Sequence, residues 1–379
     1  MASRQKLRFA LIGGGEGSFI GAVHRLAAEL DSEAELVAGC FASDPERSIR
    51  SGQSLYGLPA SRCYGDVQAL LEGEMALPEA ERIQFVIIAT PNHTHFPIAR
   101  ATLEAGFHVV CDKPMVLTVK ESRALQESLA SSDCLFAVTY NYTGYPMVSE
   151  ARRLVRSGAL GTIRRVQCEY LQGWLATDEE ESGNKQAEWR TDPARSGAAG
   201  CFGDIGSHAE NLVHFVTGLK IEALCAELST FVAGRRLDDD GNVLLRFAGG
   251  ARGVISASQI AIGEENALSI RVYGAKGSIA WSQESPNSLT VRWQDRPLEV
   301  RRSGGPDVPD GQTRLPAGHP EGYLEAFANV YRAFYARMNG AAESEYPDFS
   351  DGLRGVRFIE RVVESSAQGG TWLSFQEDL

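Results

Sequence analysis

Three consecutive glycines, Gly13–Gly15, separate an apolar segment, Lys6–Ile12, from a segment with helically spaced apolar residues, Ser18–Leu30. This order predicts a buried strand, a tight turn and a helix. Glycines in such a turn let the backbone approach a pyrophosphate, and the N-terminus of the following helix attracts anions. A turn that merely joins a strand to a helix is the alternative. The strand before the turn and the helix after it favour a dinucleotide-binding turn.

The spacing of the glycines departs from the usual G-x-G-x-x-G pattern. Counted from Gly15, the third glycine of that pattern would stand three residues on, where this chain has Ser18. The third glycine normally allows the helix to pack closely on the strand. We expect Gly21 to take this role after a three-residue insertion. Gly13 and Gly15 are then the glycines expected to face a cofactor.

Strand-like and helix-like segments alternate through the first part of the chain. Further strands are predicted at Glu35–Phe41, Phe85–Ala89, His108–Cys111 and Leu135–Thr139, and helices at Pro97–Ala105 and Thr118–Ala130. Phe85–Ala89 shows no polar alternation, as expected for a strand of a parallel sheet covered by helices on both faces. Residues 1–138 are therefore predicted to form an α/β Rossmann domain.

The pattern of predicted strands and helices changes after residue 138. A helix is predicted at Glu150–Arg156, followed by strands at Ile163–Tyr170, Ala223–Val232, Asn242–Phe247, Gly253–Ile260, Ala267–Tyr273 and Gly277–Trp281. Short strands separated by glycine-rich turns favour an antiparallel sheet. A Gly/Pro-rich loop, Ser303–Pro320, leads to a last predicted helix, Glu321–Met338. Residues 139–379 are predicted to form an α+β domain with a large, mostly antiparallel open sheet.

Charge and cysteine content exclude several classes of function. The chain carries 37 basic and 49 acidic residues, a net charge of −12, dispersed along its 379 residues. Nucleic-acid and anionic-membrane surfaces need clustered Lys and Arg, so neither partner is expected. The seven cysteines stand singly without a C-x-x-C pair, which predicts reduced thiols and no metal site. We find no signal-peptide pattern and no apolar run of about 20 residues, and we expect a cytoplasmic protein.

The end of the second strand bears on the choice of dinucleotide. Asp44 could bond the ribose hydroxyls of NAD, whereas Ser43 and Arg47 could hold the 2′-phosphate of NADP. The same Asp44-Pro45 pair is also typical of a helix start, with the aspartate as N-cap. We expect NAD and leave NADP open.

Two later motifs carry groups suited to proton transfer. Lys113, in Cys-Asp-Lys-Pro, follows a predicted strand and so lies at the edge of the sheet where α/β ligands bind. Asp204 and His208 stand four residues apart, a spacing that puts both on one face of a helix. Histidine is the usual general base near neutral pH. A surface lysine, an N-cap aspartate and a core histidine are the structural alternatives, and His214 is predicted to be structural.

The chain resembles the Gfo/Idh/MocA family of glucose–fructose oxidoreductases and inositol dehydrogenases. The resemblance rests on the glycine turn with His24, on Ala89–His95, on Asp112-Lys113-Pro114, and on Gly203-Asp204 with His208. By this resemblance Lys113 is the catalytic lysine, with Asp112 in place of the usual Glu. His208 is the base that removes a hydroxyl proton, and Asp204 orients the sugar and the histidine. The resemblance also implies cofactor contacts from Thr90, Pro91, Asn92, His95, Pro114 and Asn141.

Within that family the chain is most similar to enzymes of pyranoses and 3-keto sugars. The substrate-side residues that the resemblance implies are Tyr142, Gln172, Trp174, Trp189, Arg190 and His319. Aromatic faces suit the C–H face of a sugar, and the polar groups can bond its hydroxyls. The first hypothesis is NAD(P)-dependent oxidation or reduction of a secondary hydroxyl on a sugar, anhydrosugar or cyclitol.

Two other hypotheses use the same residues. A redox-neutral, NAD-dependent glycosidase would oxidise C3, eliminate the aglycone and return the hydride. It would need a further base near C2, from Tyr142, His208 or His319. A sensor that binds sugar or cofactor without turnover is the third. An open sheet leaves a face to be covered, so a homodimer or homotetramer is expected.

Overall fold

A computed structural model describes residues 5–306, 308, 312–342 and 344–375. Residues 307 and 309–311 of the predicted Ser303–Pro320 loop lie outside this set. The chain forms two compact units, the N-terminal unit (Met1–Asn141 with Phe327–Gly352) and the sheet unit (Tyr142–Ala326 with Leu353–Leu379). Within the described ranges we find no helix both long enough and apolar enough to span a bilayer.

The N-terminal unit contains a parallel sheet of five strands in the order β2-β1-β3-β4-β5. The strands are β1 (Leu7–Gly13), β2 (Ala34–Cys40), β3 (Phe85–Ala89), β4 (His108–Cys111) and β5 (Phe136–Val138). All five residues of β3 are buried, as expected for a central strand covered on both faces. The predicted doubly wound α/β fold is confirmed.

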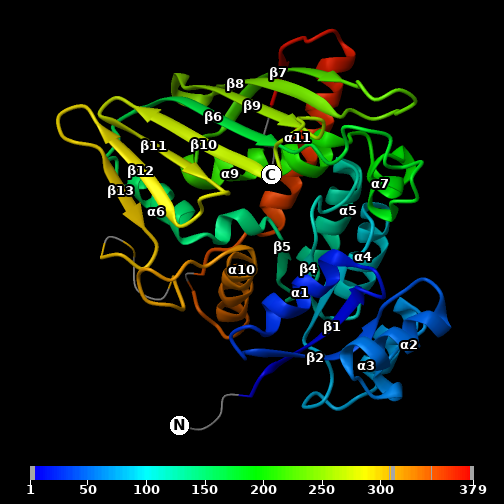
Figure 1. The fold of residues 1–379 in the computed structure, drawn as a ribbon. Helices are drawn as coiled ribbons and strands as arrows, with labels where there is room; N and C mark the ends of the chain where they lie inside the picture. Colours follow the sequence, from blue (N-terminus) through cyan, green and yellow to red (C-terminus); the bar gives the residue numbers. More distant parts are fainter. Residues whose placement is uncertain (1–4, 307, 309–311, 343, 376–379) are drawn as a thin grey trace. The chain divides into compact units, whose positions relative to one another are not determined.

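Five helices connect these strands (Figure 1). They are α1 (Phe19–Glu29), α2 (Pro45–Tyr56), α3 (Val67–Met75), α4 (His95–Glu104) and α5 (Val119–Ala130). Four of them, α1, α2, α3 and α5, begin at an N-cap residue whose side chain accepts a backbone N–H. These N-caps are Ser18, Asp44, Asp66 and Thr118. Strand β2 is added on one side of β1, and β3 to β5 are added on the other side. The strand order therefore reverses between β1 and β3, and the carboxyl ends of these two strands form a topological switch point.

Phe327–Gly352 packs with the N-terminal unit, although it follows in the part of the sequence assigned to a second domain. It holds most of helix α10 (Tyr323–Met338). The rings of Phe334 and Tyr335 lie 5.7 and 5.6 Å from that of Phe85 in β3. Apolar burial against the parallel sheet therefore draws a late helix back to the first unit. The domain boundary at 138/139 remains a prediction for the rest of the chain.

The sheet unit contains nine strands in the order β13-β12-β11-β10-β6-β9-β8-β7-β14. They are β6 (Ile163–Leu171), β7 (Ile221–Ser229), β8 (Asp240–Phe247), β9 (Arg252–Ser258), β10 (Ala267–Gly274), β11 (Gly277–Ser282), β12 (Ser288–Trp293), β13 (Glu299–Arg302) and β14 (Leu373–Ser374). All neighbours are antiparallel except β6 and β9, which are parallel. The predicted large, mostly antiparallel sheet is confirmed.

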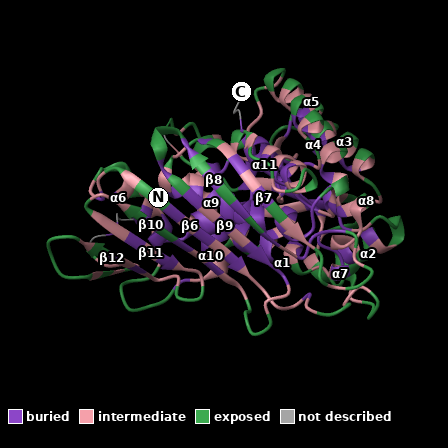
Figure 2. Ribbon diagram, turned by 90° about the horizontal axis from the view of Figure 1, so that it is seen from above, coloured by how far each residue is buried: buried purple, intermediate pink, exposed green. Residues whose placement is uncertain are grey.

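One face of this sheet is packed and the other is open. Buried and exposed residues alternate along the strands, as Figure 2 shows, and β8 is the clearest case. The helices of the unit are α6 (Pro146–Arg156), α7 (Lys185–Arg190), α8 (Pro193–Ser196), α9 (Ser207–Thr217) and most of α11 (Phe349–Ala367), and a π-helix, η4 (Phe202–Gly206), precedes α9. Helices α6, α9 and α11 share a continuous apolar core with the inward residues of the sheet.

Candidate functional site

The carboxyl edge of the parallel sheet carries the predicted polar groups of the N-terminal unit. The glycine turn follows β1, Thr90 follows β3, and Lys113 follows β4. Parallel α/β sheets bind their ligands at this edge, near the switch point. The structure therefore gathers the glycine turn, Thr90 and Lys113 at one edge.

The glycines of the turn leave no room for side chains. A Cβ at Gly15 would lie 2.4 Å from the carbonyl oxygen of Phe41, and one at Gly21 would lie 2.2 Å from Cα of Gly14. Gly21 is thus the residue at which α1 packs against the turn. Gly13 has a φ of 94°, which a residue with a side chain rarely adopts. Dinucleotide-binding turns use glycine for such a tight turn and for close helix packing.

Asn141 supplies a second sign of a ligand in the N-terminal unit. Its side chain is buried, and neither its Oδ1 nor its Nδ2 has a hydrogen-bond partner among the described residues. A buried polar group without a partner costs about 1–3 kcal/mol. A bound molecule with its own donor and acceptor would satisfy both atoms.

The residues expected near the adenosine ribose are engaged in local structure. Asp44 is the N-cap of α2, and its carboxylate accepts the backbone N–H of Arg47 at 2.8 Å. The guanidinium of Arg47 donates to the carbonyl oxygen of Glu16 in the glycine turn. Ser43 and Asp44 are exposed. The capping role foreseen for Asp44 is present, and one carboxylate can serve both a cap and a ligand.

His95 bridges two loops at the carboxyl edge of the parallel sheet. It is fully buried, with Nε2 at 2.8 Å from the carbonyl oxygen of Thr90 and Nδ1 at 2.9 Å from that of Pro114. Burial lowers its pKa, while the charge of Asp112 and the two carbonyl oxygens that face the ring oppose the shift. Both ring nitrogens face backbone carbonyls, so the imidazole bridges the loops after β3 and β4. The expected cofactor contact of His95 stays a prediction. Pro91 and Asn92 lie on the first of these loops, at the short helix η2 (Asn92–Thr94).

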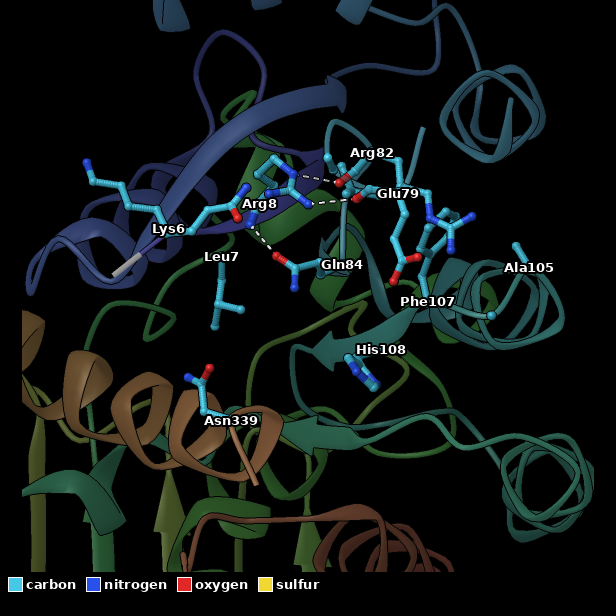
Figure 3. A pocket seen from close by; sticks show the side chains of 14 residues that line it. Lys6, Leu7, Arg8, Glu79, Arg82, Gln84, Ala105, Phe107, His108 and Asn339 are labelled. Atoms are coloured by element: carbon cyan, nitrogen blue, oxygen red, sulfur yellow. Dashed lines mark hydrogen bonds between the residues drawn. The ribbon is translucent and has the colours of Figure 1, made fainter. Parts of the chain in front are cut away.

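A cavity of about 710 Å³ opens at the opposite edge of the parallel sheet. Figure 3 shows Arg8, Gln84 and His108 on its wall, at the amino ends of β1, β3 and β4. Arg8 donates to the carbonyl oxygens of Glu79 and Arg82, so its guanidinium is satisfied within the protein. Because ligands of such sheets bind at the carboxyl ends, this cavity is not the candidate site.

In the sheet unit, Asp204 is the centre of a polar cluster. Its Oδ2 accepts hydrogen bonds from Arg190 Nε at 3.2 Å and Gln259 Nε2 at 2.9 Å. The Arg190 guanidinium lies 4.2 Å from the centre of the Trp189 ring and 6.0 Å from that of Trp174. The structure thus brings four predicted residues together and adds Gln259. Arg190 is paired with a carboxylate and stacked on an aromatic face.

Tyr142, Tyr170 and Asn266 form a closed ring of hydrogen bonds. Tyr170 donates its hydroxyl proton to Asn266 Oδ1 at 2.6 Å, so in the 2.5 Å contact between the two phenols Tyr142 is the donor. Asn266 Nδ2 closes the ring by donating to Tyr142 at 3.1 Å. Gln172 donates to Asn266 Oδ1, and Trp174 Nε1 donates to Gln172 Oε1. Such a ring polarises each of its bonds and fixes the side chains.

His208 lies against this ring of phenols. The Tyr142 ring centre is 4.8 Å from that of the imidazole, edge to face, and the Tyr170 ring centre is 6.2 Å away. His208 is 7% exposed, so it is partly shielded from water. His319 is exposed and faces only the carbonyl of Pro316, and no contact within the described residues joins it to this cluster.

Asp204 and His208 do not share a regular α-helix as predicted. Asp204 lies in the π-helix η4, and His208 is in the first turn of α9. The N-terminus of η4 is anchored by Asp238, whose carboxylate accepts the N–H groups of Gly200 at 2.7 Å and Phe202 at 2.8 Å. π-Turns inside helices are often found at functional sites. The wider turn changes the relative direction of the two side chains.

We expect Asp238→Asn to lower the free energy of unfolding by about 1–3 kcal/mol, because an amide can accept only one of the two N–H groups and opposes the other with its own donor. Urea unfolding measures the change. Asp240→Asn is the matched control, since it alters the charge of a less buried neighbour in the same acidic run. Equal stability of the two variants would contradict the anchoring role.

Sequence reasoning missed Gln259, Asn266 and Asp238. Gln259 and Asn266 flank a short loop after β9 and belong to no motif. Asp238 is part of an Asp-Asp-Asp run, which is typical of a solvated turn. Only the fold shows that these residues contact the predicted site.

Comparison with known proteins agrees with this geometry. Residues 7–140 match the model of an oxidoreductase family with an NAD-binding Rossmann fold, and residues 148–280 match the GFO/IDH/MocA C-terminal domain. The uncharacterized oxidoreductase YfiI of Bacillus subtilis is 36% identical, over 98% of this chain and 97% of its own. Levoglucosan dehydrogenase of Pseudarthrobacter phenanthrenivorans is 29% identical, over 96% of this chain and 97% of its own.

A solved structure is similar over the whole length. It is an inositol dehydrogenase homolog from Azotobacter vinelandii complexed with NAD+, with a TM-score of 0.94, 38% identity and 98% coverage of both chains. The glycine turn without room for side chains and the unpartnered amide of Asn141 fit such a dinucleotide. This chain therefore belongs to the GFO/IDH/MocA family of oxidoreductases and binds NAD through its Rossmann domain.

Proposed function

We propose that this chain oxidises a secondary hydroxyl of an uncharged sugar, anhydrosugar or cyclitol. The observation that carries the proposal is the cluster of the sheet unit, in which Asp204 is held by Arg190 and Gln259, and His208 is packed against Tyr142. Aromatic faces beside fixed amide and carboxylate groups are what a polyol needs for recognition. The relatives named levoglucosan dehydrogenase and inositol dehydrogenase homolog support this substrate class.

NAD supplies the hydride acceptor when it is bound. His208 accepts the hydroxyl proton as general base, since imidazole is the side chain best suited to this task near neutral pH. Asp204 orients the substrate, and its own orientation is fixed by Arg190 and Gln259. The ammonium group of Lys113 stabilises the negative charge that develops on the substrate oxygen.

The remaining residues bind and orient. For NAD we propose Gly13, Gly15, Gly21, Ser43, Asp44, Arg47, Thr90, Pro91, Asn92, Lys113, Pro114 and Asn141. For the substrate we propose Lys113, Tyr142, Gln172, Trp174, Trp189, Arg190, Asp204 and His208. His95 acts by holding the loops that carry Thr90 and Lys113.

The pairing of charges favours a neutral substrate. Arg190 is the cation of the cluster that could meet a phosphate or sulfonate, and it lies in an ion pair with Asp204. An anionic substituent would have to compete with this carboxylate and would be repelled by it. The hydroxyls of an uncharged sugar can instead share the donors and acceptors already present.

We expect NADH to form with neutral sugars and cyclitols, among them levoglucosan and myo-inositol, and kcat/KM for hexose 6-phosphates to be at least about tenfold lower, the range that one unfavourable contact produces. The measurement is the appearance of NADH absorbance across a panel of matched neutral and phosphorylated substrates. Reactions without sugar provide the control. Turnover confined to the phosphorylated members would contradict the neutral-substrate proposal.

The redox-neutral glycosidase is not favoured. Of the bases it could recruit, Tyr142 donates its proton to Tyr170, and burial raises the pKa of its phenol. His319 stands exposed on its loop. His208 is already assigned to the hydroxyl proton. A sensor without turnover would have little use for the Lys113, Asp204 and His208 set.

The open face of the nine-stranded sheet is the surface through which homo-oligomers are expected (Figure 2). It exposes large apolar side chains, such as Leu244 of β8 and Tyr273 of β10. A homodimer or homotetramer and a cytoplasmic location remain predictions from the sequence.

A further inference from the structure

A line of buried polar groups leads to Lys113 from the interior of the N-terminal unit. His24 of α1 and Tyr331 of α10 are 0% and 1% exposed. The imidazole Nδ1 of His24 lies 2.6 Å from the Tyr331 hydroxyl, and its Nε2 lies 4.0 Å from Oδ2 of Asp112, the residue before Lys113. The proposed reaction uses neither His24 nor Tyr331.

The direction of each hydrogen bond follows from the protons available. Burial raises the pKa of Tyr331 well above its ordinary value, and the nearby Asp112 charge adds to the shift, so the phenol keeps its proton. A phenol that donates to Nδ1 leaves the imidazole N–H on Nε2, which faces the Asp112 carboxylate at 4.0 Å. His24 thus presents a donor to the carboxylate because Tyr331 selects its tautomer.

Asp112 in turn holds the backbone of Lys113. Its Oδ1 accepts the backbone N–H of Lys113 at 2.8 Å and the hydroxyl of Thr139 at 3.0 Å. Burial alone would raise the pKa of Asp112, but His24, Lys113 and His95 around the carboxylate hold that pKa far below its ordinary value. The carboxylate is therefore a fixed anion whose two oxygens face opposite partners.

We propose that His24 and Tyr331 are positioning residues that act on Lys113 through Asp112. The phenol orients the imidazole, the imidazole Nε2 faces one carboxylate oxygen at 4.0 Å, and the other oxygen accepts the backbone N–H of Lys113. This inference rests on the proposed role of Lys113 in the reaction. Supporting residues of this kind commonly hold a reactive group within a fraction of an ångström of its working position.

The test compares Tyr331→Phe with Tyr335→Phe. Both remove one phenol oxygen from fully buried positions of α10, but the Tyr335 hydroxyl donates to the carbonyl of Ala28 and not to His24. We expect Tyr331→Phe and His24→Gln each to lower kcat about tenfold, while the Kd for NAD+, measured by calorimetry, changes less than about twofold. Tyr335→Phe should leave kcat near that of the wild type. A general loss of structure would instead lower the thermal midpoint, kcat and NAD+ affinity together.

A double-mutant cycle separates a positioning role from an unrelated loss of stability. If His24 acts through Asp112, His24→Gln in the Asp112→Asn background should cost no further activity, whereas independent effects would multiply. Additive losses, or equal kcat in Tyr331→Phe and Tyr335→Phe, would overturn the inference. Lys113→Met separates the proposed role of Lys113 from the proposed role of His24 and Tyr331. Full activity in that variant would refute the proposed role of Lys113, whereas an inactive Lys113→Met beside unaffected His24 and Tyr331 variants would refute only the positioning pair.

Discussion

Replacing His208 with Ala should lower kcat by about 10²–10⁴-fold, the contribution typical of a general base, while NAD+ still binds. The reason lies in the surroundings of the imidazole. It is 7% exposed and packed edge to face against Tyr142, whose hydroxyl is committed to Tyr170. Tyr142 therefore offers no replacement base, and little bulk water reaches the site. The rate at which NADH absorbance rises at saturating substrate gives kcat, and calorimetric titration gives the Kd for NAD+.

His214→Ala is the matched control for this variant. His214 lies on the same helix, α9, and its burial, with the nearby charge of Arg354, lowers its pKa to about 3. It is a neutral, structural histidine at working pH, and its loss should leave kcat within about twofold even where stability falls. A His208→Ala variant that turns over as fast as His214→Ala would remove His208 from the mechanism.

The sequence predicts the parallel sheet well because its strands are short and largely apolar, with β3 apolar throughout. Phe85–Ala89 and His108–Cys111 occur in the structure with the predicted bounds. The sequence indicates only the possible start of α2, at Asp44-Pro45, and it does not predict α11. Helix α2 has a polar sequence whose inward face consists largely of serine and glycine, and α11 interrupts its apolar face with charged residues. Periodicity of large apolar residues does not detect such faces.

The chemical groups of the site could be predicted, but their partners could not. Asp204 and His208 stand in a short motif, and histidine next to a carboxylate is a strong chemical signal. Gln259 directly follows β9 and Asn266 directly precedes β10. The pairing of β6 with β10 brings Asn266 to Gln172, whereas Gln259 meets Asp204 where the π-helix η4 packs on β9. Contacts between residues far apart in sequence depend on strand register, which local patterns do not encode.

Polar residues beside a site can also serve the fold. His95 stands in a motif of the cofactor loop, yet both of its ring nitrogens face backbone carbonyls. Asp44 follows β2, where the sequence predicts a ribose contact, and it caps α2. The sequence marks such residues as important because a loop that binds a ligand must itself be held. Binding and support can be separated only by the hydrogen bonds that the structure shows.

Gly21→Ala should weaken NAD+ binding by at least about tenfold, or about 1.4 kcal/mol, and lower the free energy of unfolding by about 1–3 kcal/mol, the cost of overpacking. In an open helical position this change would stabilise the protein by about 1 kcal/mol, since alanine is the better helix former. Here the added Cβ would lie 2.2 Å from Cα of Gly14, so α1 must move away from the turn. Ala22→Val, at the exposed next position of α1, adds bulk without this contact and should change NAD+ affinity little. Calorimetric titration measures the NAD+ affinity, and urea unfolding measures the free energy of unfolding. Helix propensity and the clash predict opposite signs for the change in that free energy. A stabilised Gly21→Ala variant with full NAD+ affinity would therefore show that the displaced glycine does not shape the dinucleotide turn.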